Sequence, residues 1–179
     1  MNSRGILDHP RDAGPSPGDL LDFDTFRRFI RENNNVTWRN FNVVEPDPSD
    51  PDAESVLPFL AAGAPDKARR MRLEVVARLP KGSRIWLDAP IAFANALRYR
   101  PPTLRVDKKL QRVRIPVNPH GAYAFEELLF PAKARFAMRL IVRLPKGARR
   151  APCEVYARQL YAREEVGRVT WRLVPPTKR

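Results

Sequence analysis

Two segments of the chain alternate apolar and charged residues and carry nearly the same sequence. Residues 71–82 read Met-Arg-Leu-Glu-Val-Val-Ala-Arg-Leu-Pro-Lys-Gly, and residues 136–147 read Phe-Ala-Met-Arg-Leu-Ile-Val-Arg-Leu-Pro-Lys-Gly. Alternation with a period of two places successive side chains on opposite faces of a β-strand. Each segment therefore predicts a strand with one apolar and one mostly charged face, followed by a turn at Leu-Pro-Lys-Gly. Two half-buried strands need a second layer to cover them, which predicts a β-sandwich.

The rest of the chain predicts further strands and one short helix. Branched and aromatic residues favour strands, single or in hairpins, over residues 33–44, 83–88, 104–117 and 153–174. Residues 122–131 favour a strand followed by a loop, with a helical turn as the alternative. Phe26, Phe29 and Ile30 follow helical spacing, so residues 22–31 predict a helix of two or three turns. Residues 91–97 are too short and too small-sided to assign. The 19 prolines agree with many short strands rather than with long helices.

This pattern predicts a single all-β domain, an immunoglobulin-like β-sandwich of about seven to nine strands, over residues 22–175. One short helix lies near its N-terminal end. Residues 1–21 are rich in Pro, Gly and Asp and predict an irregular lead-in, while residues 176–179 predict a frayed tail. For residues 104–117 the pattern leaves open a hairpin or one long strand with a break near Asp107.

Residues 45–66 predict an acidic, proline-rich loop. Its carboxylates are clustered as calcium ligands often are, at Asp47, Asp50, Asp52 and Glu54. Three prolines, and no glycine for a tight turn, make residues 45–54 a poor ion-binding loop. We therefore predict a solvated acidic loop and no metal site. The alternative is that this loop shields part of a basic sheet.

The charge is large and unevenly distributed. The formal net charge is +13, and residues 1–66 hold 12 acidic and 6 basic side chains, whereas residues 67–179 hold 8 acidic and 27 basic ones. A basic excess of this size favours polyanionic partners: nucleic acid, acidic polysaccharide, an anionic membrane surface or an acidic protein. The strand pattern places six arginines on a predicted basic face: Arg72, Arg78, Arg112, Arg114, Arg139 and Arg143.

Motifs for catalysis, cofactors and metals are missing from the sequence. There is no Gly-x-Ser-x-Gly nucleophile motif and no glycine-rich phosphate loop. The single cysteine, Cys153, excludes an internal disulfide and a multi-cysteine zinc site, and it is expected to be a small apolar residue in a strand. His9 and His120 are isolated in loops and are expected to face solvent. We predict a protein that is not an enzyme and has no cofactor.

The sequence resembles a family of immunoglobulin-like β-sandwich modules in large bacterial exported proteins, such as secreted subtilisin-like proteases and surface proteins. The resemblance rests on three features: the opening strand Asn33–Val44, the strands ending in Leu-Pro-x-Gly at Leu79–Gly82 and Leu144–Gly147, and the last hairpin. There Gln159 and Val166-Gly-Arg168 match the family's Gln, turn and Val-Gly-Gly, with arginine in place of the second glycine. The resemblance covers residues 23–175. It implies a non-catalytic accessory role and transfers no catalytic residues.

The sequence therefore predicts a non-catalytic binding or structural module that presents a basic face to a protein or polyanionic partner. The alternative is a nucleic-acid-binding protein that uses an arginine-rich sheet face. The first residues are polar and show no signal peptide, and no stretch is long and apolar enough to span a bilayer. Taken as complete, the chain is expected in the cytoplasm; as a piece of an exported protein, it would be extracellular.

Overall fold

The computed structural model describes residues 28, 42–44, 54–96, 105–107, 109, 111–145 and 153–174. Several predictions lie outside these residues. They concern the lead-in, most of the helix at 22–31, the strand before residue 42, the first part of the acidic loop, the turn at residues 146–147 and the C-terminal tail.

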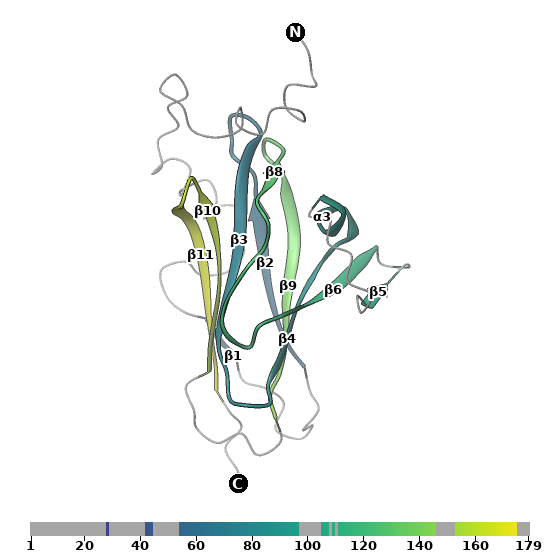
Figure 1. The fold of residues 1–179 in the computed structure, drawn as a ribbon, viewed down its shortest axis with the longest axis vertical. Helices are drawn as coiled ribbons and strands as arrows, with labels where there is room; N and C mark the ends of the chain where they lie inside the picture. Colours follow the sequence, from purple (N-terminus) through teal and green to yellow (C-terminus); the bar gives the residue numbers. More distant parts are fainter. Residues whose placement is uncertain are drawn as a thin grey trace.

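The described strands form two sheets, named here the first sheet and the second sheet. The first contains, in order, β1 (Asn42–Val44), β11 (Glu164–Leu173), β10 (Cys153–Tyr161), β3 (Arg69–Arg78) and β7 (His120–Ala124), and β8 (Leu128–Phe130) also pairs with β3. The second contains, in order, β2 (Ser55–Ala62), β9 (Arg135–Arg143), β4 (Arg84–Pro90), β6 (Arg112–Val117) and β5 (Arg105–Asp107). The long strands run along the longest axis of the molecule, and the β5–β6 hairpin extends away from it (Figure 1).

The predicted all-β sandwich is confirmed, and the described chain contains a short helix that follows β4 directly. The described part of the chain contains eleven strands, and three of them have only three residues each. The number of longer strands is eight, which agrees with the expected number of seven to nine strands. Neighbouring strands are antiparallel except β1 and β11, which are parallel. Residues 104–117, for which two readings were open, form a hairpin in which β5 pairs with β6.

The two near-identical segments become β3 and β9, one in each sheet. The predicted apolar side of β3 is buried at Met71, Leu73, Val75 and Ala77. That of β9 is buried at Met138, Leu140 and Val142, so the two strands bury the same side against one shared core. The turn after β3 is also confirmed, because the Ser83 amide donates to the Pro80 carbonyl at 3.1 Å and Gly82 has a φ of 91°.

The predicted loop over residues 45–66 is wrong for residues 55–62, which form β2. This strand pairs antiparallel with β9, and Leu57, Phe59 and Ala61 are buried while Val56 and Pro58 are exposed. Pro58 lies within this strand and cannot donate a hydrogen bond to a strand ladder. β2 is, however, the edge strand of the second sheet in the described chain, and an edge is the place where a sheet tolerates proline.

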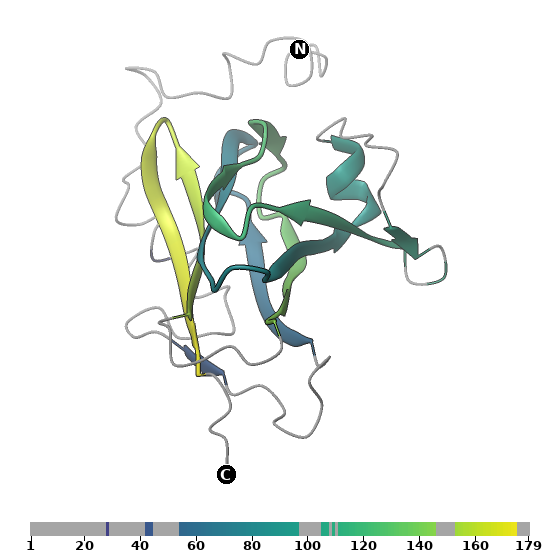
Figure 2. The ribbon, with the colours of Figure 1, turned by 60° about the horizontal axis from the view of Figure 1, so that its bottom comes forward.

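The core is closed at one end by a short helix, α3 (Ile91–Ala96), in the segment that the sequence left unassigned. The ring of Phe93 meets Phe130 and Phe136 edge to face, at centroid distances of 6.2 and 5.6 Å. Figure 2 shows α3 on the opposite side of the molecule from the β10–β11 hairpin. Among the described residues, no helix has the length and hydropathy needed to cross a membrane.

A buried glutamine joins the two sheets by hydrogen bonds. Gln159 of β10 donates from Nε2 to the Ala62 carbonyl and accepts the Ala62 amide proton at Oε1, both at 2.9 Å. Both backbone groups of Ala62 are thus satisfied by one side chain from the opposite layer. Gln159, which carries part of the family resemblance, therefore has a structural role here.

Candidate functional site

The six arginines of the predicted basic face belong to both sheets. Arg72 and Arg78 lie on β3 and are exposed, whereas the other four lie on β6 and β9 of the second sheet. The outer faces of the two layers of a sandwich point in opposite directions. No single surface therefore holds all six. We call the outer surface formed by Arg112, Arg114, Arg139 and Arg143, together with Asp88 and Glu54, the arginine face.

Asp88 of β4 contacts three of the four arginines of the arginine face, and we call these four residues the Asp88 cluster: Asp88, Arg112, Arg114 and Arg139. The register places it opposite Arg139 of β9 on one side and Arg114 of β6 on the other. Its Oδ2 accepts a hydrogen bond from Nη2 of Arg139 at 2.7 Å and lies 4.0 Å from Nε of Arg114. Its Oδ1 accepts from Nε of Arg112 at 2.5 Å. The Asp88 side chain is only 6% exposed, so one shielded carboxylate orders three guanidinium groups.

Glu54 occupies a second position on the same face. It immediately precedes β2, and its two carboxylate oxygens accept hydrogen bonds from Nη1 and Nη2 of Arg114 at 3.1 and 3.3 Å. Nη2 of Arg143 donates to one of these oxygens at 3.3 Å. Glu54, one carboxylate of the predicted acidic loop, thus shields part of the basic sheet, which was the alternative left open by the sequence. The arginine face is a surface on which a carboxylate is held between two guanidinium groups.

An apolar row crosses the sheet between these two charged clusters. The register aligns Val56 of β2, Ile141 of β9, Trp86 of β4 and Pro116 of β6. Ile141 is only 1% exposed although it points away from the core, while Val56 is 45% exposed. The guanidinium of Arg143 lies over the Trp86 ring, 5.9 Å from its centroid.

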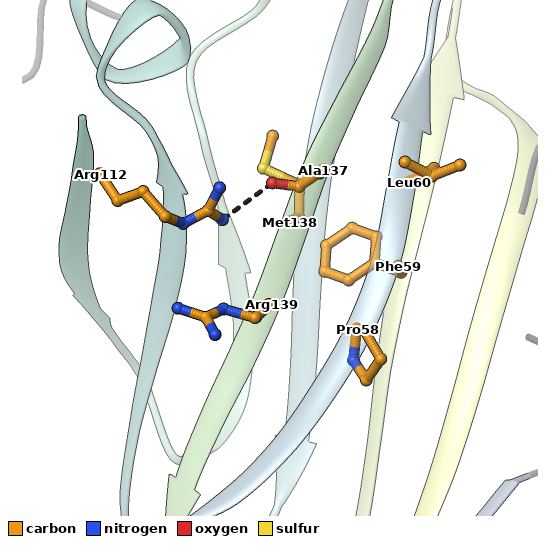
Figure 3. A pocket seen from close by; sticks show the side chains of 7 residues that line it. All are labelled: Pro58, Phe59, Leu60, Arg112, Ala137, Met138 and Arg139. Carbon is orange, nitrogen blue, oxygen red and sulfur yellow. Dashed lines mark hydrogen bonds between the residues drawn. The ribbon is translucent and has the colours of Figure 1, made fainter. Parts of the chain in front are cut away.

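A groove of about 390 Å³ lies beside the Asp88 cluster, over β9 and the edge strand β2. Its apolar part is formed by the outward-facing Pro58, Leu60 and Ala137. The guanidinium groups of Arg112 and Arg139 line its other side, as Figure 3 shows. Nη2 of Arg112 donates to the Ala137 carbonyl at 2.8 Å, which fixes that guanidinium at the rim of the groove.

Sequence reasoning did not select Asp88, and it considered Glu54 only as one carboxylate of the acidic loop. Asp88 lies in an otherwise apolar strand, and Glu54 was counted with the acidic loop. Their importance comes from strand register, because only the pairing of β4 with β6 and β9 brings one carboxylate next to three arginines. A polar residue at an outward position of a mostly buried strand is the signal that would have found Asp88.

We also located the cysteine, the histidine and the potential metal ligands among the described residues. Cys153 is fully buried in β10, and burial raises the pKa of its thiol, which disfavours the reactive thiolate. His120 begins β7 and is exposed. Within the part of the chain that the structure describes, no three His, Cys, Asp or Glu side chains come together in the way that holds a metal ion.

No protein-family model and no curated protein sequence matches this chain. Three solved structures are similar in arrangement. The N-terminal domain of PorA has a TM-score of 0.44 at 6% identity, covering 76% of this chain and 88% of that one. A collagen-binding domain from a Staphylococcus aureus adhesin has a TM-score of 0.34 at 10% identity, covering 73% and 93%. AvmM, which catalyses macrocyclization in alchivemycin A biosynthesis, has a TM-score of 0.34 at 9% identity, covering 81% and 88%. Likenesses this low imply nothing about the function of this chain.

Proposed function

We propose that this protein is a non-catalytic binding module whose contact surface is the arginine face of the second sheet. The observation that carries the proposal is the Asp88 cluster, in which one shielded carboxylate orders the guanidinium groups of Arg112, Arg114 and Arg139. Ordered guanidinium groups lose less conformational entropy when they bind an anion. The partner is a protein or another polyanion, and the module has an accessory role of the kind that the sequence resemblance implies.

The balance of charge supports the choice of this surface. Among the side chains that the structure describes, the four arginines of the face form ion pairs with two carboxylates, Asp88 and Glu54. The surplus of positive charge is therefore local and fixed in position. Such a surplus steers anionic partners toward the surface and orients them on arrival.

The experiment compares matched double substitutions on the two near-identical strands. Arg139→Gln with Arg143→Gln removes two charges from the arginine face, and Arg72→Gln with Arg78→Gln removes two from the opposite sheet. Binding of poly-L-glutamate is measured by isothermal titration at constant salt. We expect the β9 pair to weaken binding about tenfold and the β3 pair by less than about twofold.

Equal losses in the two double variants would contradict the proposal, because they would mean that total charge alone determines binding. Circular dichroism and thermal unfolding of each variant verify that the sandwich is intact. A duplex and a single-stranded DNA are titrated in parallel. DNA binding that is tighter than that of poly-L-glutamate, steeply salt-dependent and lost in the β9 pair would favour the nucleic-acid alternative.

A further inference from the structure

We infer that the ligand of the arginine face is an acidic peptide segment of a partner protein, in which a carboxylate is next to an apolar side chain. The carboxylate binds between Arg112 and Arg139, and the apolar side chain lies in the groove formed by Pro58, Leu60 and Ala137. This inference rests on the proposed function and specifies which ligand the face selects.

Glu54 shows how the face binds a carboxylate. It accepts two hydrogen bonds from Arg114 and one from Arg143, with donor–acceptor distances of 3.1 to 3.3 Å. Planar guanidinium groups match carboxylates by such paired hydrogen bonds. The other two arginines of the face, Arg112 and Arg139, share Asp88 as a partner and line the groove.

Arg112 and Arg139 keep donors for a second carboxylate. Arg112 uses Nε and Nη2 for Asp88 and Ala137, and Arg139 uses Nη2 for Asp88. Among the described residues, Nη1 of neither arginine has a hydrogen-bond partner. The Asp88 side chain is 6% exposed and accepts hydrogen bonds from Nε of Arg112 and Nη2 of Arg139, which holds both side chains in place and does not use their Nη1 donors. A carboxylate at this point completes the arrangement that Glu54 makes with the neighbouring pair.

The groove provides the apolar half of the recognition. Its volume of about 390 Å³ is near the lower end of the roughly 300–1,000 Å³ typical of small-ligand pockets, which suits one or two side chains. Pro58, Leu60 and Ala137 contribute carbon atoms to it, next to the two cations (Figure 3). A peptide with an acidic residue beside an apolar one matches both halves.

The same lining disfavours stacked nucleobases. Single-stranded nucleic acids bind through aromatic side chains on which bases stack. The one aromatic ring at the groove belongs to Phe59, which is 6% exposed and packs in the core against Trp171 at a centroid distance of 5.8 Å. The charge and the apolar carbons therefore favour an acidic peptide over a nucleic acid.

The test uses two capped octapeptides that are identical except at one position, where a glutamate is followed by leucine in one and by serine in the other. Binding to the full chain is followed by amide chemical shifts, which detect weak complexes. We expect the leucine peptide to bind about tenfold more tightly, because part of the leucine surface leaves water. Both peptides are expected to lose binding in an Arg112→Gln, Arg139→Gln variant.

A groove-filling variant separates this inference from the proposed function. Ala137→Met occupies the groove without changing the charge, and Ala122→Met, at an exposed outward position on β7 of the first sheet, is the matched control. Ala137→Met is expected to abolish the preference for leucine and to leave binding of the serine peptide within twofold. Ala122→Met is expected to keep the preference.

Three outcomes would overturn the inference. Equal binding of the two peptides, or a preference for leucine that survives in Ala137→Met, would overturn the groove while poly-L-glutamate binding still supports the arginine face. Binding of poly-L-glutamate with no binding of either peptide would also overturn it, because the face would then need a long polyanion. If the unaltered protein bound neither the peptides nor poly-L-glutamate, the proposed function itself would be contradicted.

Discussion

The strands β3 and β9 have nearly the same sequence, but the outer surfaces they contribute to differ. Glu74 of β3 and Arg139 of β9 occupy equivalent positions in the two segments and have opposite charge. Each meets its counter-ion on a neighbouring strand: Glu74 accepts from Arg158 of β10, and Arg139 donates to Asp88 of β4. The inner sides of the two strands, by contrast, are both buried in the shared core.

The counter-ions determine what each surface offers to a partner. On the first sheet, Arg158 is shared between Glu74 and Glu165, and Arg168 lies both beside Glu165 and over the Tyr156 ring, 4.0 Å from its centroid. These two arginines and two glutamates therefore neutralise one another in ion pairs. On the second sheet, one shielded aspartate orders three arginines and leaves a surplus. Two strands of similar sequence thus contribute to outer surfaces with different charge pairing, and this difference comes from the neighbouring strands.

The largest expected effects lie on the inner sides, where the two strands should behave alike. Leu73→Ala in β3 and Leu140→Ala in β9 each remove a fully buried side chain from the same core. We expect each to lower the free energy of unfolding by about 2–5 kcal/mol, measured by urea denaturation. A loss below 1 kcal/mol in one strand only would mean that the two layers do not share a core.

The next comparison concerns the outer sides, where the two strands should differ. Asp88→Asn leaves three guanidinium groups without their shielded counter-ion, and we expect a loss of about 2–4 kcal/mol. Glu74→Gln leaves Arg158 with Glu165 and should cost about 1 kcal/mol or less. Urea denaturation at low and high salt measures both. Similar losses in the two variants would remove the distinction between the surfaces.

The smallest expected effect is an acid dependence confined to the start of β3. The fully buried Arg69 side chain donates hydrogen bonds from Nε and Nη2 to the carboxylate of Asp66, and these bonds hold the pKa of Asp66 below its ordinary value. Before β9, Ala134 occupies the position equivalent to Arg69, and alanine has no side-chain donor for such hydrogen bonds. Because the pKa of Asp66 is lower in the folded state, its ionised carboxylate stabilises the fold at pH values above its unfolded-state pKa of about 4. This stabilisation is lost as the pH falls through the pKa of Asp66 in the folded state.

Asp66→Asn should therefore reduce stability at pH 7 by about 1 kcal/mol or less, since the Asp66 side chain is 42% exposed and partly screened by water. The difference between the variant and the unaltered protein should shrink as the pH is lowered from 5 to 2. Urea denaturation across this range provides the measurement. A difference that stays constant with pH would show that the ionised carboxylate of Asp66 is not what stabilises this end of the strand.

The fold class and most strands could be predicted because they depend on local pattern. Alternation predicted β3 and β9, and branched and aromatic residues predicted the hairpin that β10 and β11 form. β2 was not predicted because residues 55–62 were included in the acidic, proline-rich loop. Its Pro58 is compatible with a strand because β2 lies at the edge of the second sheet in the described chain. The sheet in which a strand lies is a long-range property that its own residues do not encode.

The candidate site was predictable only in part for the same reason. The arginines were visible as outward residues, but their division between two sheets and their dependence on Asp88 follow from pairing across strands distant in sequence. Glu54 and Arg114 are 60 residues apart, and no local pattern connects them. The groove likewise combines residues of β2, β6 and β9.

The most direct test of the arginine face as a contact surface is a residue-by-residue map of binding. Amide chemical shifts of the isotope-labelled protein are followed during titration with poly-L-glutamate at fixed salt. We expect the shifts to concentrate on β4, β6 and β9, around Asp88 and Arg139, and we expect β3 and β10 to change little. Shifts that concentrate instead around Arg72 and Arg78, or that spread evenly over both sheets, would contradict this expectation.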